Sequence, residues 1–220
     1  MNSGKTRKLA ITALLVVLTF VLGLTPIGYI PNPVLPVLSL TLMCLPVIIG
    51  TITEGLKTGL ILGFVFGITS FLKALGVTLA PDALGTLILS ISVVKTMVVI
   101  FIPRLIIPIM TWLIYKAIAR ESGRSQRVAA GIAAFMGSVT NTVLFLGALY
   151  LLFLPQVGEI AGFLSGMSAV VGFDVTANTL FGLYAFLAGV NGLPEAVVAV
   201  LLCIPVVWAV QKQKGKKKPV

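Results

Sequence analysis

The chain has 220 residues, of which 58% are hydrophobic and only 10% are charged. Ordinary soluble domains are about half apolar and a quarter charged, so a soluble fold could not bury this much apolar surface, and lipid must cover the excess. The formal net charge of +10 does not indicate nucleic-acid binding, because the basic residues flank apolar runs and form no basic face with interleaved aromatic residues.

The apolar runs predict six transmembrane helices, since one span needs about 20 mostly apolar residues. In chain order they cover residues 9–30, 37–53, 58–75, 96–119, 128–154 and 192–210. The prolines of segment 25–36 end the first helix. This first run exceeds the roughly 7–15 residues of a signal-peptide core and no A-x-A-like site follows it, so we expect a retained span. Glycines 59, 63 and 67 predict that another helix approaches the third span closely.

Two stretches are apolar but interrupted. We interpret residues 73–95 as a long outer loop with a partly buried or re-entrant helix. A second long loop covers 155–176, and we interpret 178–189 as an outer segment that dips into the membrane. The expected fold is therefore an all-α integral membrane protein, a six-transmembrane-helix bundle with long outer loops. It comprises one transmembrane domain, 1–212, and a basic tail, 213–220.

The basic residues predict the orientation. All of the sixteen Lys and Arg except Lys73, Lys95 and Arg104 lie in the N-terminus, the 54–57 turn, the 116–127 loop and the tail. The positive-inside rule makes these segments cytoplasmic. We therefore expect a multi-pass protein of the cell membrane with both termini in the cytoplasm, which requires an even number of spans.

The residue types and motifs of the sequence give little support to an enzymatic function. The chain has no histidine, and its two cysteines lie far apart, so we predict no metal site and no disulfide framework. The Gly-Lys-Thr at residues 4–6 is no phosphate-binding loop, because the upstream glycine is missing. We expect no enzymatic activity, no catalytic residue and no cofactor.

Charged residues inside a span are costly and are functional candidates by default. Arg104 and Glu195 are predicted at similar depth in the outer halves of their spans. Two readings remain open. The two side chains can pair and tie two helices together, or Arg104 can face a cavity and receive an anionic ligand, because its planar fork suits a carboxylate.

Several polar residues are further candidates for ligand contact. Thr140 and Asn141 place hydrogen-bonding groups in mid-span, where interhelical bonding is the alternative. Asn178 and Asn191 flank the predicted dipping segment. Lys73 and Lys95 can steer a ligand or extend to the interface, and Tyr29 can contact a ligand or belong to an aromatic belt.

Six segments resemble the substrate-binding S components of energy-coupling factor (ECF) vitamin transporters. They are residues 8–15 (KLAITALL), 25–31 (TPIGYIP), 45–50 (LPVIIG), 63–70 (GFVFGITS), 102–104 (IPR) and 137–142 (GSVTNT). The proline-rich segment, the Thr-Asn-Thr segment and residues 192–195 (GLPE) resemble the pantothenate-type members most; riboflavin-, folate- and thiamine-binding members are the alternatives.

The resemblance implies a module that binds a vitamin outside the cell and then associates with a transmembrane coupling protein and two ATPases. Members of the family often carry Ala-x-x-x-Ala on the first span as a docking face for the coupling protein. Here Ala10 and Ala13 lie three apart, and Leu14 takes the second family position. A stand-alone secondary transporter is a rival reading, but we see no internal repeat between the two halves. A channel would need rings of polar residues from several subunits.

Overall fold

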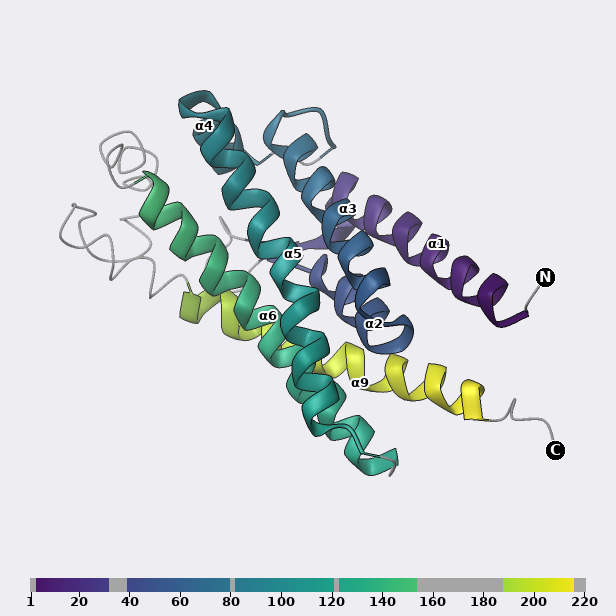
Figure 1. Cartoon of the computed structure of the whole chain (residues 1–220). Helices are drawn as coiled ribbons and strands as arrows, with labels where there is room; N and C mark the ends of the chain where they lie inside the picture. Colours follow the sequence, from purple (N-terminus) through teal and green to yellow (C-terminus); the bar gives the residue numbers. More distant parts are fainter. Residues whose placement is uncertain (1–2, 32–38, 80–81, 121–122, 154–187, 216–220) are drawn as a thin grey trace.

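A computed structural model describes residues 3–31, 39–79, 82–120, 123–153 and 188–215 (Figure 1). The elements are α1 (Ser3–Leu24), a 3-10 turn (Pro26–Gly28), β1 (Tyr29–Pro31), β2 (Ser39–Thr41), α2 (Cys44–Glu54), α3 (Leu56–Ala74), α4 (Ala83–Ile91), α5 (Val93–Ile118), α6 (Gly123–Phe153), a π-helical turn (Ala188–Gly192) and α9 (Leu193–Gly215). Five helical stretches of these described residues are long and apolar enough to cross a membrane: Gly4–Leu24, Leu56–Ala74, Val93–Ile118, Gly123–Phe153 and Ala188–Val210. The prediction of an all-α membrane protein is therefore confirmed.

The predicted span at 37–53 is wrong. Helix α2 begins only at Cys44 and has 11 residues, about 16 Å of helix against an apolar thickness of about 30 Å. The preceding residues form a short antiparallel hairpin, in which Tyr29 pairs with Thr41. The cause is the proline-rich stretch after α1, which cannot continue a helix. The predicted count of six spans is consequently not reached within the described residues, and segment 178–187 lies outside them.

The glycine-rich face of α3 is confirmed as a close helix contact. A Cβ atom at Gly63 would collide with the backbone carbonyl oxygen of Arg104 on α5. Gly59 and Gly67 similarly face Pro108 and the ring of Phe101. Helix α5 also lies along α6, and α6 packs against α9, while α1 and α2 pack on α3. The seam between α3 and α5 thereby fixes the backbone around Arg104.

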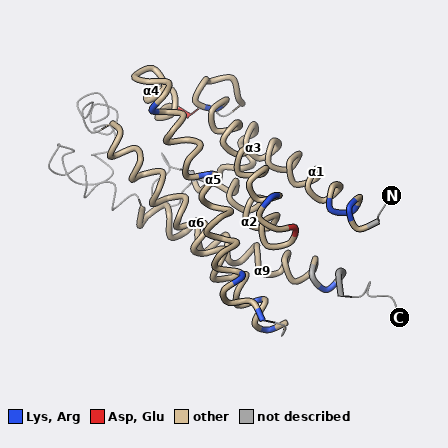
Figure 2. Tube along the Cα trace, viewed as in Figure 1, with Lys and Arg blue, Asp and Glu red and all other residues tan. Residues whose placement is uncertain are grey.

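The charges separate along the bundle axis, as Figure 2 shows. Lys and Arg gather where α1 begins, where α2 meets α3, where α5 and α6 meet, and where α9 ends. We call this the basic end. The Thr12 and Thr58 hydroxyls lie 3.4 Å apart and place the start of α1 level with the start of α3. At the opposite end, the Leu79 N–H donates to the Leu24 carbonyl at 3.3 Å.

Short elements close the opposite end. Helix α4 has nine residues and lies against α3 and α5, where a partly buried or re-entrant helix was predicted. Its Gly85 and Ile88 are buried. Buried side chains from five helices form the core of the bundle, one each from α2, α3, α5, α6 and α9: Ile48, Leu62, Ile107, Ala134 and Cys203.

Helix α9 continues to Gly215, past the predicted boundary at 212. The division into a domain and a tail stays a prediction.

Candidate ligand-binding site

Arg104 lies in the interior of the bundle with only 8% of its surface exposed. Pro103 explains how part of its guanidinium is held, because a proline has no N–H to donate to the carbonyl four residues earlier. That carbonyl belongs to Val99, and it accepts a hydrogen bond from Arg104 Nη1 at 3.1 Å. Pro108 likewise leaves the Arg104 carbonyl without a helical donor, and Gly63 packs against that oxygen. Pro103 therefore leaves the Val99 carbonyl free to hold the Arg104 guanidinium, and Pro108 leaves the Arg104 carbonyl free to face Gly63.

Two aromatic rings flank the guanidinium. Its Cζ lies 5.1 Å from the ring centroid of Phe66 on α3 and 4.8 Å from that of Phe145 on α6. Such contacts stabilise a cation and leave the edge of the planar group for hydrogen bonds. The Nε atom is buried and has no hydrogen-bond partner among the described residues. The site thus contains a fixed cation with an unused donor.

The hydrogen bonds of Glu195 go to groups other than this cation. Among the described residues, no carboxylate oxygen lies within the 4.0 Å of an ion pair with Arg104. Glu195 instead accepts hydrogen bonds through Oε1 from the Thr41 backbone N–H at 2.7 Å and from Asn191 Nδ2 at 3.2 Å. It lies in the first turn of α9, where the helix dipole favours an acid. The described residues thus show no direct ion pair between Arg104 and Glu195, and the two hydrogen bonds of Glu195 join β2 to α9.

Asn141 on α6 offers a second unused group. The residue is 6% exposed, and its Oδ1 is buried without a partner among the described residues. The neighbouring Thr142 packs against Gly192, where a Cβ atom would lie 2.8 Å from Thr142 Cγ2. The Thr140 hydroxyl, by contrast, donates to the Met136 carbonyl of its own helix at 2.7 Å. An unpartnered buried acceptor is unfavourable, so Asn141 Oδ1 is available to a donor such as a ligand N–H or O–H.

The remaining predicted residues lie toward the opposite end from the basic one. Lys73 Nζ lies 3.2 Å from the ring centroid of Tyr29 and so joins α3 to β1. Burial raises the pKa of Tyr29 to about 12, against the lowering effect of the Arg104 charge. The phenol therefore stays protonated and can donate. Lys95 Nζ lies 5.6 Å from the ring centroid of Phe153, and Asn178 lies outside the described residues.

The predicted docking residues lie on α1. Ala10 and Ala13 are exposed, while Leu15 on another side of this helix is buried in the core. Large apolar side chains surround the two alanines on the exposed face, and Leu9 and Leu14 are 72% and 69% exposed. Helix α1 thus presents a free apolar face with two small residues.

The structure adds contacts that the sequence did not single out. Phe66, Phe145 and the Val99 carbonyl all hold Arg104. Of these three contacts, only the free Val99 carbonyl could have been predicted from the sequence, because Pro103 follows it by four residues. Taken together, the site can bind an anion that also carries a hydrogen-bond donor. Among the described residues, no group of three or more Cys, Asp or Glu is positioned to hold a metal.

Comparisons with known proteins agree with a transport role. Residues 7–207 match the model of a family described as the substrate-specific component of the ECF transporter. The chain is 31% identical over 225 aligned residues to the pantothenic acid transporter PanT of Lactococcus lactis subsp. cremoris (strain MG1363). That alignment covers 98% of this chain and 99% of the relative.

Proposed function

Since the chain belongs to the substrate-specific components of ECF transporters, we propose that it captures pantothenate, with Arg104 as the residue that binds the carboxylate. The observation that carries this proposal is a buried guanidinium with a free Nε and no described carboxylate within 4.0 Å. A buried charge without a partner is costly, so an anionic ligand is its expected counter-ion. We take pantothenate as the ligand because the Lactococcus relative is named a pantothenic acid transporter.

The chemistry of pantothenate suits the other groups of the site. Besides its carboxylate the vitamin has an amide and two hydroxyls, and Asn141 Oδ1 can accept from one of these donors. Glu195 positions β2 and Asn191 beside the ligand through its two hydrogen bonds. The neutral phenol of Tyr29 can donate. Thr140 and Asn178 complete the proposed contacts, and Lys73 and Lys95 draw the anion toward the site from the end opposite the basic one.

We find no nucleotide-binding motif in this chain, so the proposed import takes its energy from partner proteins. A transmembrane coupling protein with two ATPases would supply the energy. The α1 face with Ala10 and Ala13 would contact the coupling protein, since small residues let helices approach closely in a membrane. We place the basic end in the cytoplasm by the positive-inside rule, which puts both termini there.

Ligand identity and energy coupling can be tested separately. Native mass spectrometry of gently purified protein should show one retained small molecule with the mass of pantothenate. Calorimetry should then give binding of pantothenate but not of riboflavin, folate or thiamine. A retained mass of another vitamin would replace pantothenate and leave the family role intact. Uptake into proteoliposomes that contain this chain alone would instead support a stand-alone transporter, because the S component needs its ATPase partners.

A further inference from the structure

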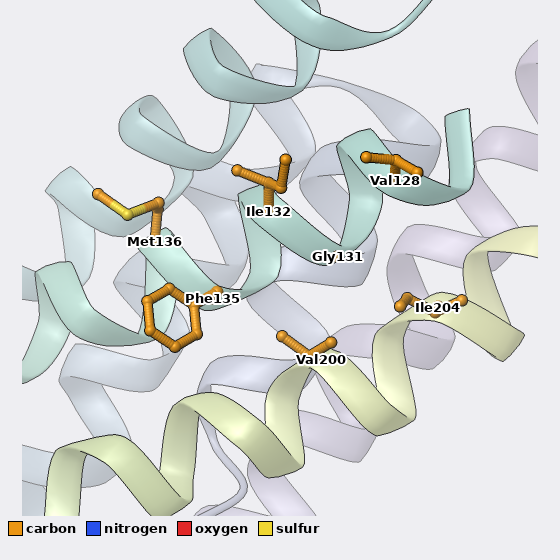
Figure 3. A pocket seen from close by; sticks show the side chains of 7 residues that line it. All are labelled: Val128, Gly131, Ile132, Phe135, Met136, Val200 and Ile204. Carbon is orange, nitrogen blue, oxygen red and sulfur yellow. The ribbon is translucent and has the colours of Figure 1, made fainter. Parts of the chain in front are cut away.

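An apolar groove of about 370 Å³ runs between α6 and α9 (Figure 3). Val128, Ile132 and Met136 line it from α6, and Val200 and Ile204 point toward it from α9. Gly131 lets the two helices approach, because the nearest atom to a Cβ placed there would be Ile204 Cδ1 at 3.1 Å. From residue 128 to residue 136 the groove follows α6 for about 12 Å.

On both helices, basic residues follow the groove lining toward the basic end. Arg124 and Arg127 lie one helical turn before Val128 and Gly131, and so on the same sides of α6. On α9, Trp208 and Lys212 follow Ile204 at steps of four residues, and Lys212 Nζ lies 5.0 Å from the Trp208 ring. All three basic side chains are exposed, and Trp208 is 45% exposed. Neither helix has an acidic residue along the groove or at this end.

We propose that this groove holds an acyl chain of an anionic phospholipid whose phosphate lies among Arg124, Arg127 and Lys212. The apolar lining suits a hydrocarbon chain and excludes the polar vitamin. The three basic side chains favour an anionic headgroup over a zwitterionic one, because basic clusters at the ends of transmembrane helices attract anionic headgroups. Trp208 lies where its amphipathic ring fits the interface between chain and headgroup. The groove is therefore a lipid site at the basic end, separate from Arg104.

The two tryptophans of the chain, Trp112 and Trp208, allow a direct test. A Trp112→Phe variant keeps only the reporter beside the groove. It is placed in nanodiscs in which a fixed fraction of either phosphatidylglycerol or phosphatidylcholine carries brominated chains, which quench a tryptophan in contact. We expect Trp208 to be quenched more strongly by the brominated phosphatidylglycerol. Equal quenching by both lipids would overturn the proposal.

The charge dependence gives the second arm of the test. Arg124→Gln with Arg127→Gln should reduce the preference for phosphatidylglycerol about fivefold for each arginine removed, the effect of one basic residue near an anionic surface. The matched control is Lys5→Gln with Lys8→Gln, which removes the same charge from the same end of the bundle on α1 and should leave the preference unchanged. An equal loss in both double variants would mean that the whole basic end, and not this groove, attracts the lipid.

The apolar part of the site has its own variant. Ile132→Phe narrows the groove without a change in charge and should lower quenching of Trp208 by brominated phosphatidylglycerol. Unchanged quenching would show that the lipid chain lies elsewhere and would overturn the proposal.

Discussion

Replacing Arg104 by alanine should remove most of the affinity for pantothenate. The side chain is 8% exposed and contacts the Phe66 and Phe145 rings. Its Nη1 donates to the Val99 carbonyl, while Nε has no partner among the described residues. A carboxylate at this edge would be largely desolvated, and truncating one member of a buried charge pair costs about 2–5 kcal/mol. The dissociation constant should therefore rise roughly 30-fold to a few thousandfold, at about tenfold for each 1.4 kcal/mol.

The assay compares pantothenate with panthenol, in which a hydroxyl replaces the carboxylate. Isothermal titration with purified, monodisperse protein should show that the parent chain prefers pantothenate, and that Arg104→Ala binds both ligands with similar, weak affinity. Arg104→Lys should give an intermediate loss for pantothenate, because lysine keeps the charge but not the planar fork. Thermal unfolding of each variant reports any loss of the packing between the two rings.

The two ligands separate a binding role from a structural one. If Arg104→Ala weakens pantothenate and panthenol equally, the substitution has only disturbed the fold. If the variant remains folded and binds pantothenate like the parent, Arg104 does not contact the carboxylate and the reasoning fails. Rescue by Glu195→Gln is not expected, because Glu195 makes no ion pair with Arg104 within 4.0 Å.

Four further outcomes are expected. Glu195→Ala should lower stability in thermal unfolding by about 1–3 kcal/mol, because it strands a hydrogen-bonded backbone N–H; Glu195→Gln keeps the acceptor and should cost less. Gly63→Ala should weaken ligand binding in calorimetry through its collision with α5, whereas Gly147→Ala on α6, which has open space around it, should not. Ala10→Trp and Ala13→Trp should leave binding intact and abolish uptake with the coupling complex; parental uptake in both would place docking on another face. New cysteines at position 123 and in the C-terminal tail should react with impermeant maleimide only from the cytoplasmic side, and labelling of the tail from outside would reverse the proposed topology.

The long helices were predictable because apolar length and flanking charge decide them. The spans expected at 58–75 and 96–119 are α3, Leu56–Ala74, and α5, Val93–Ile118. The hairpin of β1 and β2 was not predictable from composition, because residues 37–53 are apolar enough to be a span. The hairpin depends on a distant contact, since the Thr41 N–H is bound by a carboxylate 154 positions later in the chain.

The sequence predicted which polar residues are buried in the candidate site, but it did not predict which groups they contact. Arg104, Asn141 and Glu195 are all buried, as charged or amide groups within apolar runs suggested. Similar depth in the membrane left pairing of Arg104 with Glu195 open, because depth does not tell which way each side chain faces around its helix. The rings of Phe66 and Phe145 come from two other helices, and apolar runs contain many such phenylalanines.

Arg104 contributes one positive charge to the candidate site, and the carboxylate of a bound ligand would offset that charge. A membrane potential acts on a moving charge with about 2.3 kcal/mol per elementary charge for each 100 mV. Any import cycle exposes the site first to one side of the membrane and then to the other. Under the proposed function, the bound carboxylate adds one negative charge, so the loaded site is one unit less positive than the site without ligand. A membrane voltage would therefore act differently on the inward step of the loaded site and on the return of the site without ligand.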